Sequence, residues 1–324
     1  MSGRYQRQQV LPEVGADGQA RLARAQVLVA GAGGLGCALL PYLAAAGVGR
    51  LSVCDPDRVE ESNLHRQPLY RMQDIGAYKV DAARAALRAL NPEVSVSAYR
   101  ERLTPAGVAG RIAGCDVVVD AADSLALTYM LSDACRAAQL PLVSAAVLGL
   151  EGYVGVFCGG APSYRAVFPD MPRTLGSCAQ GGVLGSAVGV IGTLQAHLTL
   201  ALLLGLEPDP RGRLLTVDFR RLHFGGFGFG GAREAPGAQL TFIAREQIGP
   251  GDLVIELRSR AEAPQPAVPG ALRLEVEARG RDPPRLPAAA RGVLCCRSGV
   301  RAWRAARALE AQGQTRLALL ALGE

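Results

Sequence analysis

The sequence predicts an α/β protein in which a doubly wound, mostly parallel sheet is followed by a second, smaller α/β domain. A glycine-rich loop, Gly31–Gly36, comes directly after the apolar run 27–30. Such a loop at a helix N-terminus suits nucleotide phosphates. Near the other end of the chain, Cys296 follows the apolar run 293–295 and opens a second loop before a helical pattern. That setting suits a reactive thiolate.

Composition bounds the class of protein. With 324 residues, the chain is long enough for two domains with their own cores. A 49% hydrophobic content and 40 glycines fit a compact α/β protein rather than a disordered one. The net charge of +6 is modest and the arginines are dispersed, so we expect no nucleic-acid partner. Eight irregularly spaced cysteines indicate reduced thiols in a cytoplasmic protein rather than a disulfide framework.

The first half alternates short apolar runs with helical patterns, which is the rhythm of βαβ units with helices on both faces of a parallel sheet. We expect helices over 35–46 and 78–90. The apolar stretch 182–204 approaches the length of a membrane span, but it contains Gln195 and His197, so we expect a buried or subunit-facing helix and no membrane association. The predicted strands of this half are 27–30, 51–54, 94–98, 116–119 and 142–144.

Later segments close this domain and form the second. Strands are expected at 214–219 and 222–229, followed by a linker rich in Gly, Ala and Pro over 230–239. The larger first domain then covers 1–229 and the smaller second domain covers 240–324. In the smaller unit the patterns predict strands at 253–257 and 292–295 and a helix at 300–312.

The glycine loop alone does not identify the nucleotide. Asp55 lies about 20 residues further on, where an acid contacts a ribose hydroxyl, and this spacing fits NAD and ATP equally well. Lys79 is the only lysine of the chain. A compact ammonium on a flexible stem suits a triphosphate better than a planar guanidinium does. Asn63 and Arg66, a little upstream, strengthen the prediction of a phosphate site.

Several motifs together resemble the family of MoeB, ThiF and the ubiquitin-activating enzymes. They are Arg-Tyr-Gln-Arg-Gln at 4–8, the glycine loop, Asp-Pro-Asp-Arg-Val-Glu-Glu-Ser-Asn-Leu-His-Arg-Gln at 55–67, Asp-Ile-Gly-Ala-Tyr-Lys at 74–79, Ala122-Asp123, and the glycine pattern from 182 to 195. The resemblance covers residues 4 to about 230 and implies a Rossmann-like ThiF fold. It implies that Asp55 holds the ribose, that Asp123 positions Mg²⁺, and that Arg7 reaches across a homodimer into the partner's site. The implied nucleotide contacts are Gly33, Gly34, Gly36, Asp55, Asp57, Asn63, Arg66, Gln67 and Lys79.

The resemblance also implies the reaction. The C-terminal Gly-Gly carboxylate of a small ubiquitin-like sulfur carrier attacks the α-phosphate of ATP, and pyrophosphate leaves. Because the carboxylate is already ionised, no strong base is needed, and catalysis consists of positioning and charge stabilisation.

Three departures from the family pattern affect the expectations. Many members carry Cys-Tyr-Arg-Cys where this chain has Ser163-Tyr164-Arg165-Ala166, and no cysteine lies between Cys178 and Cys295. Tetrahedral zinc needs four ligands, so we predict no zinc site. Ser124 stands where Asn is frequent, and Thr128 where Arg is common. These two changes raise the alternative of a non-catalytic, carrier-binding scaffold with a decayed ATP site.

The Cys296 loop resembles that of rhodanese domains over about 240–324. The segment Leu253–Arg258, with Glu256 in place of the usual Asp, belongs to the same resemblance. It implies that Cys296 carries a persulfide received from thiosulfate or a persulfide donor protein. Backbone N–H groups and nearby arginines are expected to lower the pKa of the thiol. The predicted persulfide loop is Arg297, Ser298, Gly299 and Arg301.

Two further cysteines have open roles. Cys295 is expected to be a core residue that ends a strand. Cys178 stands at a crossover position where relatives can bond covalently to the carrier or relay sulfur, and an inert loop cysteine is the alternative. Taken together, the patterns predict ATP-dependent adenylation and thiocarboxylation of a carrier. An NAD-dependent oxidoreductase fused to a sulfurtransferase is the other alternative, although a Tyr-x-x-x-Lys pair is not evident.

Overall fold

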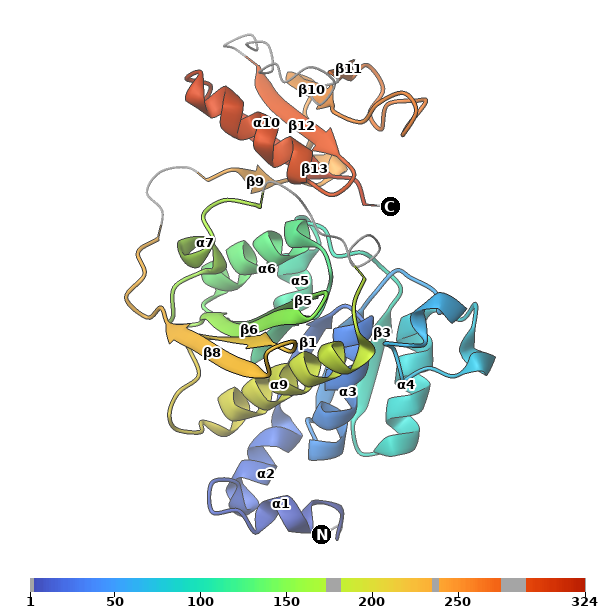
Figure 1. Ribbon diagram of the computed structural model, residues 1–324, viewed down its shortest axis with the longest axis vertical. Helices are drawn as coiled ribbons and strands as arrows, with labels where there is room; N and C mark the ends of the chain where they lie inside the picture. Colours follow the sequence, from blue (N-terminus) through green and yellow to red (C-terminus); the bar gives the residue numbers. More distant parts are fainter. Residues whose placement is uncertain (1–2, 173–181, 235–238, 275–289, 324) are drawn as a thin grey trace.

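The computed structural model describes residues 3–172, 182–234, 239–274 and 290–323 (Figure 1). Eight strands form the larger sheet in the order β3-β2-β1-β4-β5-β6-β7-β8. Strands β1 to β5 pair in parallel, and β6 to β8 add an antiparallel edge. The strands are β1 (Gln26–Ala30), β2 (Arg50–Cys54), β3 (Ser95–Tyr99), β4 (Val117–Asp120), β5 (Pro141–Leu148), β6 (Glu151–Cys158), β7 (Arg213–Asp218) and β8 (His223–Gly228).

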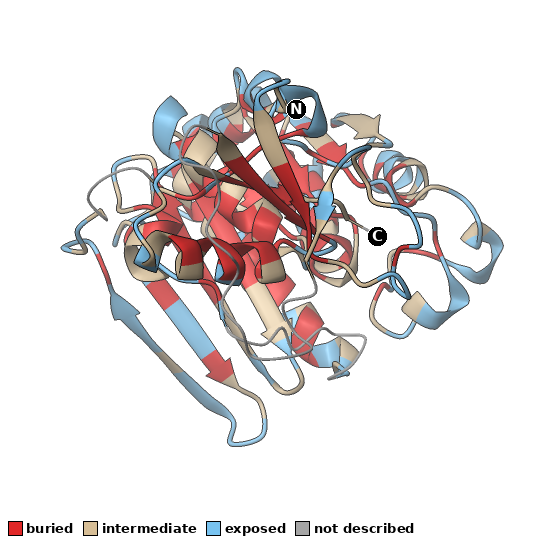
Figure 2. Ribbon diagram, turned by 90° about the horizontal axis from the view of Figure 1, so that it is seen from above, coloured by how far each residue is buried: buried red, intermediate tan, exposed pale blue. Residues whose placement is uncertain are grey.

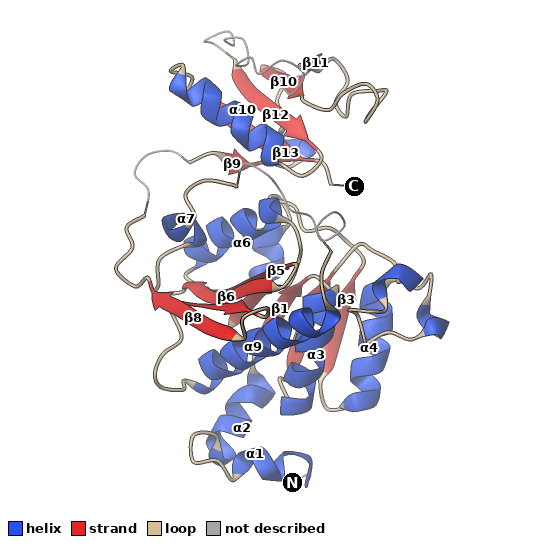
Figure 3. Ribbon diagram, in the orientation of Figure 1, coloured by secondary structure: helices blue, strands red, loops and turns tan. Residues whose placement is uncertain are grey.

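The predicted doubly wound α/β fold is confirmed, since helices cover both faces of this sheet (Figure 3). Val27 and Val29 of β1 face a core built with α3, α4 and α9, whereas Leu28 and Ala30 face the core built with α5, α6 and α7. This alternation follows from the two-residue period of a strand. The helices are α2 (Gly15–Arg24), α3 (Gly34–Ala46), α4 (Lys79–Leu90), α5 (Val108–Ile112), α6 (Leu125–Ala138), α7 (Tyr164–Val167) and α9 (Gly185–Leu204).

Short elements complete the first part of the chain. They are α1 (Gln6–Gln9) and the 3₁₀ turns η1 (Gly3–Tyr5), η2 (Glu61–Asn63) and η3 (Met72–Asp74). Arg4 Nη1 donates to the Leu90 carbonyl at 2.8 Å, and Asn91 Nδ2 donates to Tyr5 Oη at 2.8 Å. These bonds tie the N-terminal segment to the C-terminal end of α4. The N-terminal segment therefore lies beside the C-terminal end of α4, away from the end where Lys79 starts this helix (Figure 1).

The chain order creates a switch point beside β1. From β1 the chain builds outward through β2 and β3, then returns to place β4 on the other side of β1. Ligands of open α/β sheets bind outside the carboxyl ends of the strands at such a point. The fold thus brings the loops after β1, β2 and β4 to one edge.

Helix α9 is the long apolar helix expected from the sequence, over Gly185–Leu204. By length and composition it could cross a membrane, with a mean hydropathy of 1.8 over its most apolar window. Half of that window is buried inside the fold. Gly192 allows a close crossing with α3, because a Cβ at this position would lie 2.7 Å from the Ala38 Cβ. The predicted buried role is confirmed for the side of α9 that packs on α3.

A second, five-stranded sheet follows, in the order β11-β10-β12-β13-β9, with every pair parallel. Its elements are β9 (Thr241–Phe242), the turn η4 (Arg245–Gln247), β10 (Asp252–Glu256), β11 (Leu272–Arg273), β12 (Arg291–Cys296), α10 (Val300–Ala311) and β13 (Leu317–Ala321). The sequence patterns predicted β10, β12 and α10. They did not single out β13, although its run of Leu and Ala is typical of a buried strand.

The two sheets are joined by a common apolar core. Trp303 of α10 is 1% exposed, and its ring centroid lies 5.0 Å from that of Tyr129 on α6. Arg307 of α10 pairs with Asp170 at 2.8 Å. Figure 1 shows the second sheet stacked on the side of α6 and α7. The outer strand β8 of the larger sheet is by contrast mostly exposed, and Figure 2 draws exposed residues in pale blue and buried ones in red.

Candidate functional site

The glycine loop connects β1 to α3 and requires glycine at two points. Gly31 has a φ of 104°, and a Cβ there would lie 2.6 Å from the Ala121 carbonyl oxygen. A Cβ at Gly36 would collide with the Gly31 carbonyl oxygen. The loop therefore presses against the end of β4 and leads directly into the N-terminus of α3. First-turn N–H groups of a helix favour an anion at this position.

Asp55 fixes the shape of this loop. Its Oδ2 accepts a hydrogen bond from the Ala32 N–H at 2.7 Å, and its Oδ1 accepts one from the Asp57 N–H at 2.8 Å. Burial raises the pKa of Asp55, and the charge of Lys79 opposes that shift. Each carboxylate oxygen keeps a second lone pair, so a ribose hydroxyl can still donate to Asp55.

Lys79 lies at the first position of α4, at the same edge. Its Nζ is 2.9 Å from Asp57 Oδ2, and its backbone N–H donates to the Asp57 carbonyl at 2.9 Å. The lysine side chain is 8% exposed and the Asp57 side chain 58% exposed. An ammonium has three donors, so Lys79 can hold Asp57 and a phosphate oxygen together.

Arg66 and Gln67 bring the preceding segment to the glycine loop. A Cβ at Gly34 would lie 3.7 Å from Arg66 Cγ, and one at Gly33 would lie 3.8 Å from Gln67 Nε2. Gln67 is buried, and its Oε1 has no hydrogen-bond partner. A buried carbonyl oxygen without a donor is costly, so its position next to the loop fits a bound ligand with a donor group. Asn63 is close by in sequence, and its Nδ2 donates to Ser62 Oγ at 3.2 Å.

Asp123 follows the carboxyl end of β4 and is exposed. Ser124 N-caps α6 by accepting from the Leu127 N–H at 3.4 Å. Thr128 points inward and donates to Asp120 Oδ2 at 2.7 Å. In this chain Thr128 therefore supports the buried Asp120 below the site. Only Asp123 of this segment is placed to meet a solvated ligand such as Mg²⁺.

A buried support was missed by the sequence reasoning. Asp120 is fully buried and accepts from the hydroxyls of Thr128 and Ser144 at 2.7 and 2.9 Å. Gln195 of α9 donates to the Asp120 carbonyl at 2.6 Å. The only sequence signal was an acid at the end of an apolar run, three residues before Asp123.

Asp120 predicts a particular dependence of stability on pH. Burial raises its pKa from an ordinary value of 3.8 to about 6, against the opposing hydrogen bonds. A raised pKa means that the folded state holds the proton more tightly, so this group's stabilisation is complete below pH 3.8 and is lost as the pH rises to about 6. The loss amounts to about 3 kcal/mol of unfolding free energy. We expect Asp120→Asn to flatten this fall in urea denaturation at several pH values. A variant with the same pH profile as the parent chain would contradict the assignment.

Arg7 lies on α1, at the opposite edge of the sheet, and is exposed. Within one chain it does not join the glycine loop. Its expected role requires a partner chain and stays a prediction.

The Cys296 loop joins β12 to α10. The Sγ atom accepts hydrogen bonds from the N–H groups of Gly299 and Ala302, at 3.2 and 3.4 Å. Gly299 has a φ of 86°. Arg297 and Ser298 are exposed, whereas Arg301 is held by Glu262 through two contacts of 2.7 and 2.6 Å. The loop is therefore shaped to surround a sulfur anion with backbone donors.

The expected lowering of the thiol pKa is wrong for this conformation. Burial raises the pKa of Cys296, and the N–H groups of Ala302 and Gly299 together with Arg301 only oppose that shift. Cys296 is 0% exposed, which the sequence could not show. Cys295 is the expected core residue, and it faces the other side of the sheet. Cys178 and its neighbours lie outside the described residues.

Glu256 ends β10 and is fully buried. Burial alone would raise the pKa of Glu256, but hydrogen bonds from Arg258 and the Ala267 N–H lower it to about 2. The ionised carboxylate thereby organises the loop after β10.

Ser163, which stands at the first position of the cysteine pair that many family members carry, is bound to a carboxylate. Glu234 accepts from the Ser163 N–H and Oγ, both at 2.7 Å. Within the described ranges, no group of three or more His, Cys, Asp and Glu side chains is arranged to hold a metal ion.

We predict that the purified protein contains no stoichiometric zinc and that a chelator leaves its melting temperature unchanged. Glu234→Ala should lower that temperature, because Ser163 loses both acceptors, at a cost of about 1–3 kcal/mol. Elemental analysis that finds about one zinc per chain would contradict the prediction.

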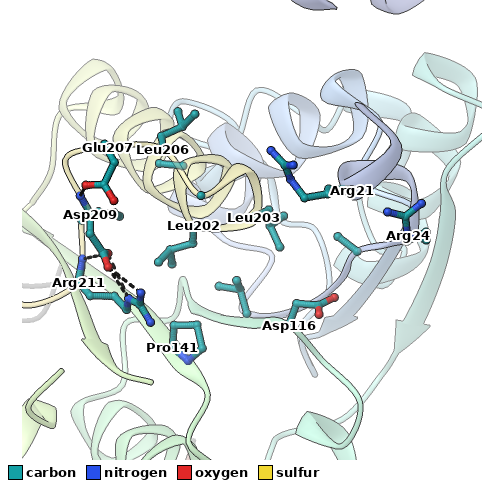
Figure 4. Close-up of a pocket in the computed structure, with 15 residues that line it drawn as sticks. Arg21, Arg24, Asp116, Pro141, Leu202, Leu203, Leu206, Glu207, Asp209 and Arg211 are labelled. Carbon is teal, nitrogen blue, oxygen red and sulfur yellow. Dashed lines mark hydrogen bonds and ion pairs between the residues drawn. The ribbon is translucent and has the colours of Figure 1, made fainter. Parts of the chain in front are cut away.

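A cavity of about 440 Å³ lies away from these residues, between α2 and the C-terminal end of α9 (Figure 4). Several of its charged side chains are engaged with the fold. Arg211 bonds to Asp209, and Arg21 Nη2 donates to the Leu204 carbonyl at 2.9 Å. None of the predicted site residues lines this cavity.

Comparison with known proteins supports a nucleotide site at the glycine loop. A model of the ThiF family matches residues 5–231. The chain belongs to the ThiF family. "Adenylyltransferase and sulfurtransferase MOCS3" of Bos taurus is 52% identical over 224 residues, which are 68% of this chain and 49% of that protein. The chain thus matches about half the length of this relative.

A second relative is matched over most of its length. "Sulfur carrier protein adenylyltransferase" of Thermus thermophilus is 45% identical over 232 residues, covering 68% of this chain and 86% of that protein. Among solved structures, E. coli MccB with MccA-N7isoASN superposes with a TM-score of 0.63 at 22% identity, covering 71% of this chain and 73% of that chain. This last likeness concerns the fold, and it confirms the ThiF-type sheet.

Proposed function

We propose that this ThiF-family chain uses ATP and Mg²⁺ to adenylate the C-terminal Gly-Gly carboxylate of a ubiquitin-like sulfur carrier, and that Cys296 then supplies sulfur to give a thiocarboxylate. The observation that carries the first half is the convergence of the glycine loop, Asp55, Lys79, Gln67 and Asp123 on one edge of the sheet. The names of the MOCS3 and Thermus thermophilus relatives support the same reaction class.

In the adenylation step the chain positions its substrates and stabilises charge. N–H groups at the start of α3 and the ammonium of Lys79 face the phosphates, and Asp55 accepts from the ribose. The carrier carboxylate attacks the α-phosphate, the bond to the β-phosphate oxygen breaks, and pyrophosphate leaves. Mg²⁺, held through Asp123, would neutralise charge on the phosphates. Preorganised donors of this kind supply most of the rate gain in such reactions.

In the sulfur step Cys296 holds the sulfur that is to be transferred. Its thiolate attacks the sulfane sulfur of thiosulfate, sulfite leaves, and a persulfide remains. The terminal persulfide sulfur attacks the carbonyl carbon of the acyl-adenylate and expels AMP, leaving an acyl disulfide. A second thiol then reduces that disulfide, and the thiocarboxylate is released. An external thiol can supply this step. The expected roles of Cys178 are a covalent bond to the carrier or a sulfur relay.

The five-stranded parallel sheet supports the rhodanese-like assignment of residues 240–324. Cys296 ends its central strand, and its Sγ meets two backbone donors at the start of α10. Burial of the thiol implies that the loop must open to a sulfur donor before it is charged.

The test is isotope exchange between pyrophosphate and ATP, with small ubiquitin-fold proteins ending in Gly-Gly as probes. Exchange that depends on such a carrier and on its terminal glycine supports adenylation. Carrier binding without exchange would favour the non-catalytic scaffold. A change in nicotinamide absorbance without pyrophosphate release would favour the oxidoreductase. A homodimer, in which Arg7 completes the partner's site, is part of the proposal.

A further inference from the structure

The Cys296 loop is seated directly against the first domain of its own chain. A Cβ at Gly299 would lie 3.3 Å from the Ala126 Cβ, and one at Gly323 would lie 2.6 Å from Arg102 Cζ. Gly323 is part of the same seat, because its N–H donates to the Arg297 carbonyl at 2.9 Å. Glycine at both positions leaves room for these side chains of the first domain.

The two contact points lie on either side of the nucleotide site. Ala126 is in the first turn of α6, just after Asp123 and β4, and Arg102 lies just after β3. In the sheet order β3-β2-β1-β4, the strands between them are β2 and β1. Those strands carry Asp55 and the glycine loop at their carboxyl ends. The sulfur-bearing loop and the nucleotide site therefore share one edge of one chain.

Further contacts fix the second sheet in this position. Besides the packing of Trp303 on Tyr129, Arg165 Nη2 donates to the Leu240 carbonyl at 3.0 Å and Arg307 pairs with Asp170. Leu294, Cys296 and Leu319 belong to the same apolar cluster as Tyr129 and Leu131. An apolar interface that is reinforced by polar contacts restricts relative domain motion.

We propose that Cys296 delivers sulfur to the nucleotide site of its own chain, not to that of a partner. This inference rests on the proposed function. The persulfide sulfur attacks the acyl-adenylate carbon formed over Lys79 and Asp123 of the same polypeptide, and AMP leaves. A thiol reductant added to the assay then releases the thiocarboxylate.

The experiment combines two differently tagged variants. Cys296→Ser keeps the nucleotide site, and Lys79→Ala keeps the persulfide site. For a dimeric protein, the two variants are co-expressed, and particles that hold both chains are isolated through both tags. For a monomeric protein, the two purified variants are mixed in equal amounts. The matched control combines wild-type chains with the Cys296→Ser, Lys79→Ala double variant. Both samples contain the same number of intact sites of each kind, and only the control has the two on one chain.

Thiocarboxylate is measured by intact-mass spectrometry of the carrier, with thiosulfate as donor and dithiothreitol as reductant. We expect the control to form it and the split pair to form no more than Cys296→Ser alone. Equal yields from the two samples would overturn delivery within one chain. A wild-type protein that adenylates the carrier but never thiocarboxylates it would overturn the sulfur half of the proposed function, and this inference with it.

Discussion

Lys79→Ala and Asp123→Ala should each leave the fold intact and lower carrier-dependent ATP–pyrophosphate exchange by roughly a hundredfold or more, since one charge-stabilising contact is commonly worth about 3 kcal/mol. The fold should survive the lysine change because Asp57, its partner, is 58% exposed and stays hydrated when unpaired. Asp123 is itself exposed.

Three controls sharpen this result. Arg84→Ala removes a cation from the same helix, where it pairs with Asp81 at 3.0 Å, and should exchange at the wild-type rate. Lys79→Arg keeps the charge but replaces a compact ammonium with a planar fork, and we expect it to lose activity as well. Circular dichroism checks the fold of each variant. Wild-type exchange in both alanine variants would remove Lys79 and Asp123 from the site.

Cys296→Ser should abolish thiocarboxylate formation from thiosulfate and leave carrier adenylation unchanged. Serine can occupy the same loop and meet the Gly299 N–H, but its hydroxyl cannot form a persulfide. Intact-mass spectrometry of the carrier separates the acyl-adenylate from the thiocarboxylate.

Cys295→Ala is the matched control for this prediction. Its thiol is adjacent in sequence and equally buried, but it faces the opposite side of the sheet from Cys296. We expect it to retain thiocarboxylation. Full thiocarboxylation by Cys296→Ser, with thiosulfate as sole donor, would exclude the C-terminal domain as the sulfur source.

The sequence predicted the parts of the fold that rest on local patterns. Strands β1 and β2 and helices α3 and α4 follow from apolar runs and from the glycine loop, whose spacing is imposed by backbone contact with Ala121. Strand β13 was not predicted, and β5 was predicted too short. The pattern of apolar residues in a buried strand does not mark where its pairing with a distant strand ends. The sequence also placed Asp55, Asp57, Gln67 and Lys79, which the structure brings together.

What the sequence could not supply were properties of three-dimensional packing. The burial of Cys296 depends on the surrounding loop and core. The pKa of its thiol is therefore raised, whereas the sequence led us to expect a lowered pKa. The inward turn of Thr128 toward Asp120 depends on the helix register of α6. Arg301 lies near the sulfur as expected and opposes the rise in the Cys296 pKa. Its pairing with Glu262 was not predicted, because Glu262 belongs to a loop that is distant in sequence.

The burial of Lys79 has a consequence for the chemistry of the whole surface. An activated carboxyl group reacts readily with primary amines, and lysine side chains are the usual source of stray isopeptide bonds. Here the only lysine is locked against Asp57 inside the site, and the remaining 34 of the 35 Lys and Arg residues are arginines. Guanidinium groups are protonated at neutral pH and are poor nucleophiles. In the proposed reaction, an activated carrier would therefore meet a scaffold whose other cationic side chains are arginines rather than lysines.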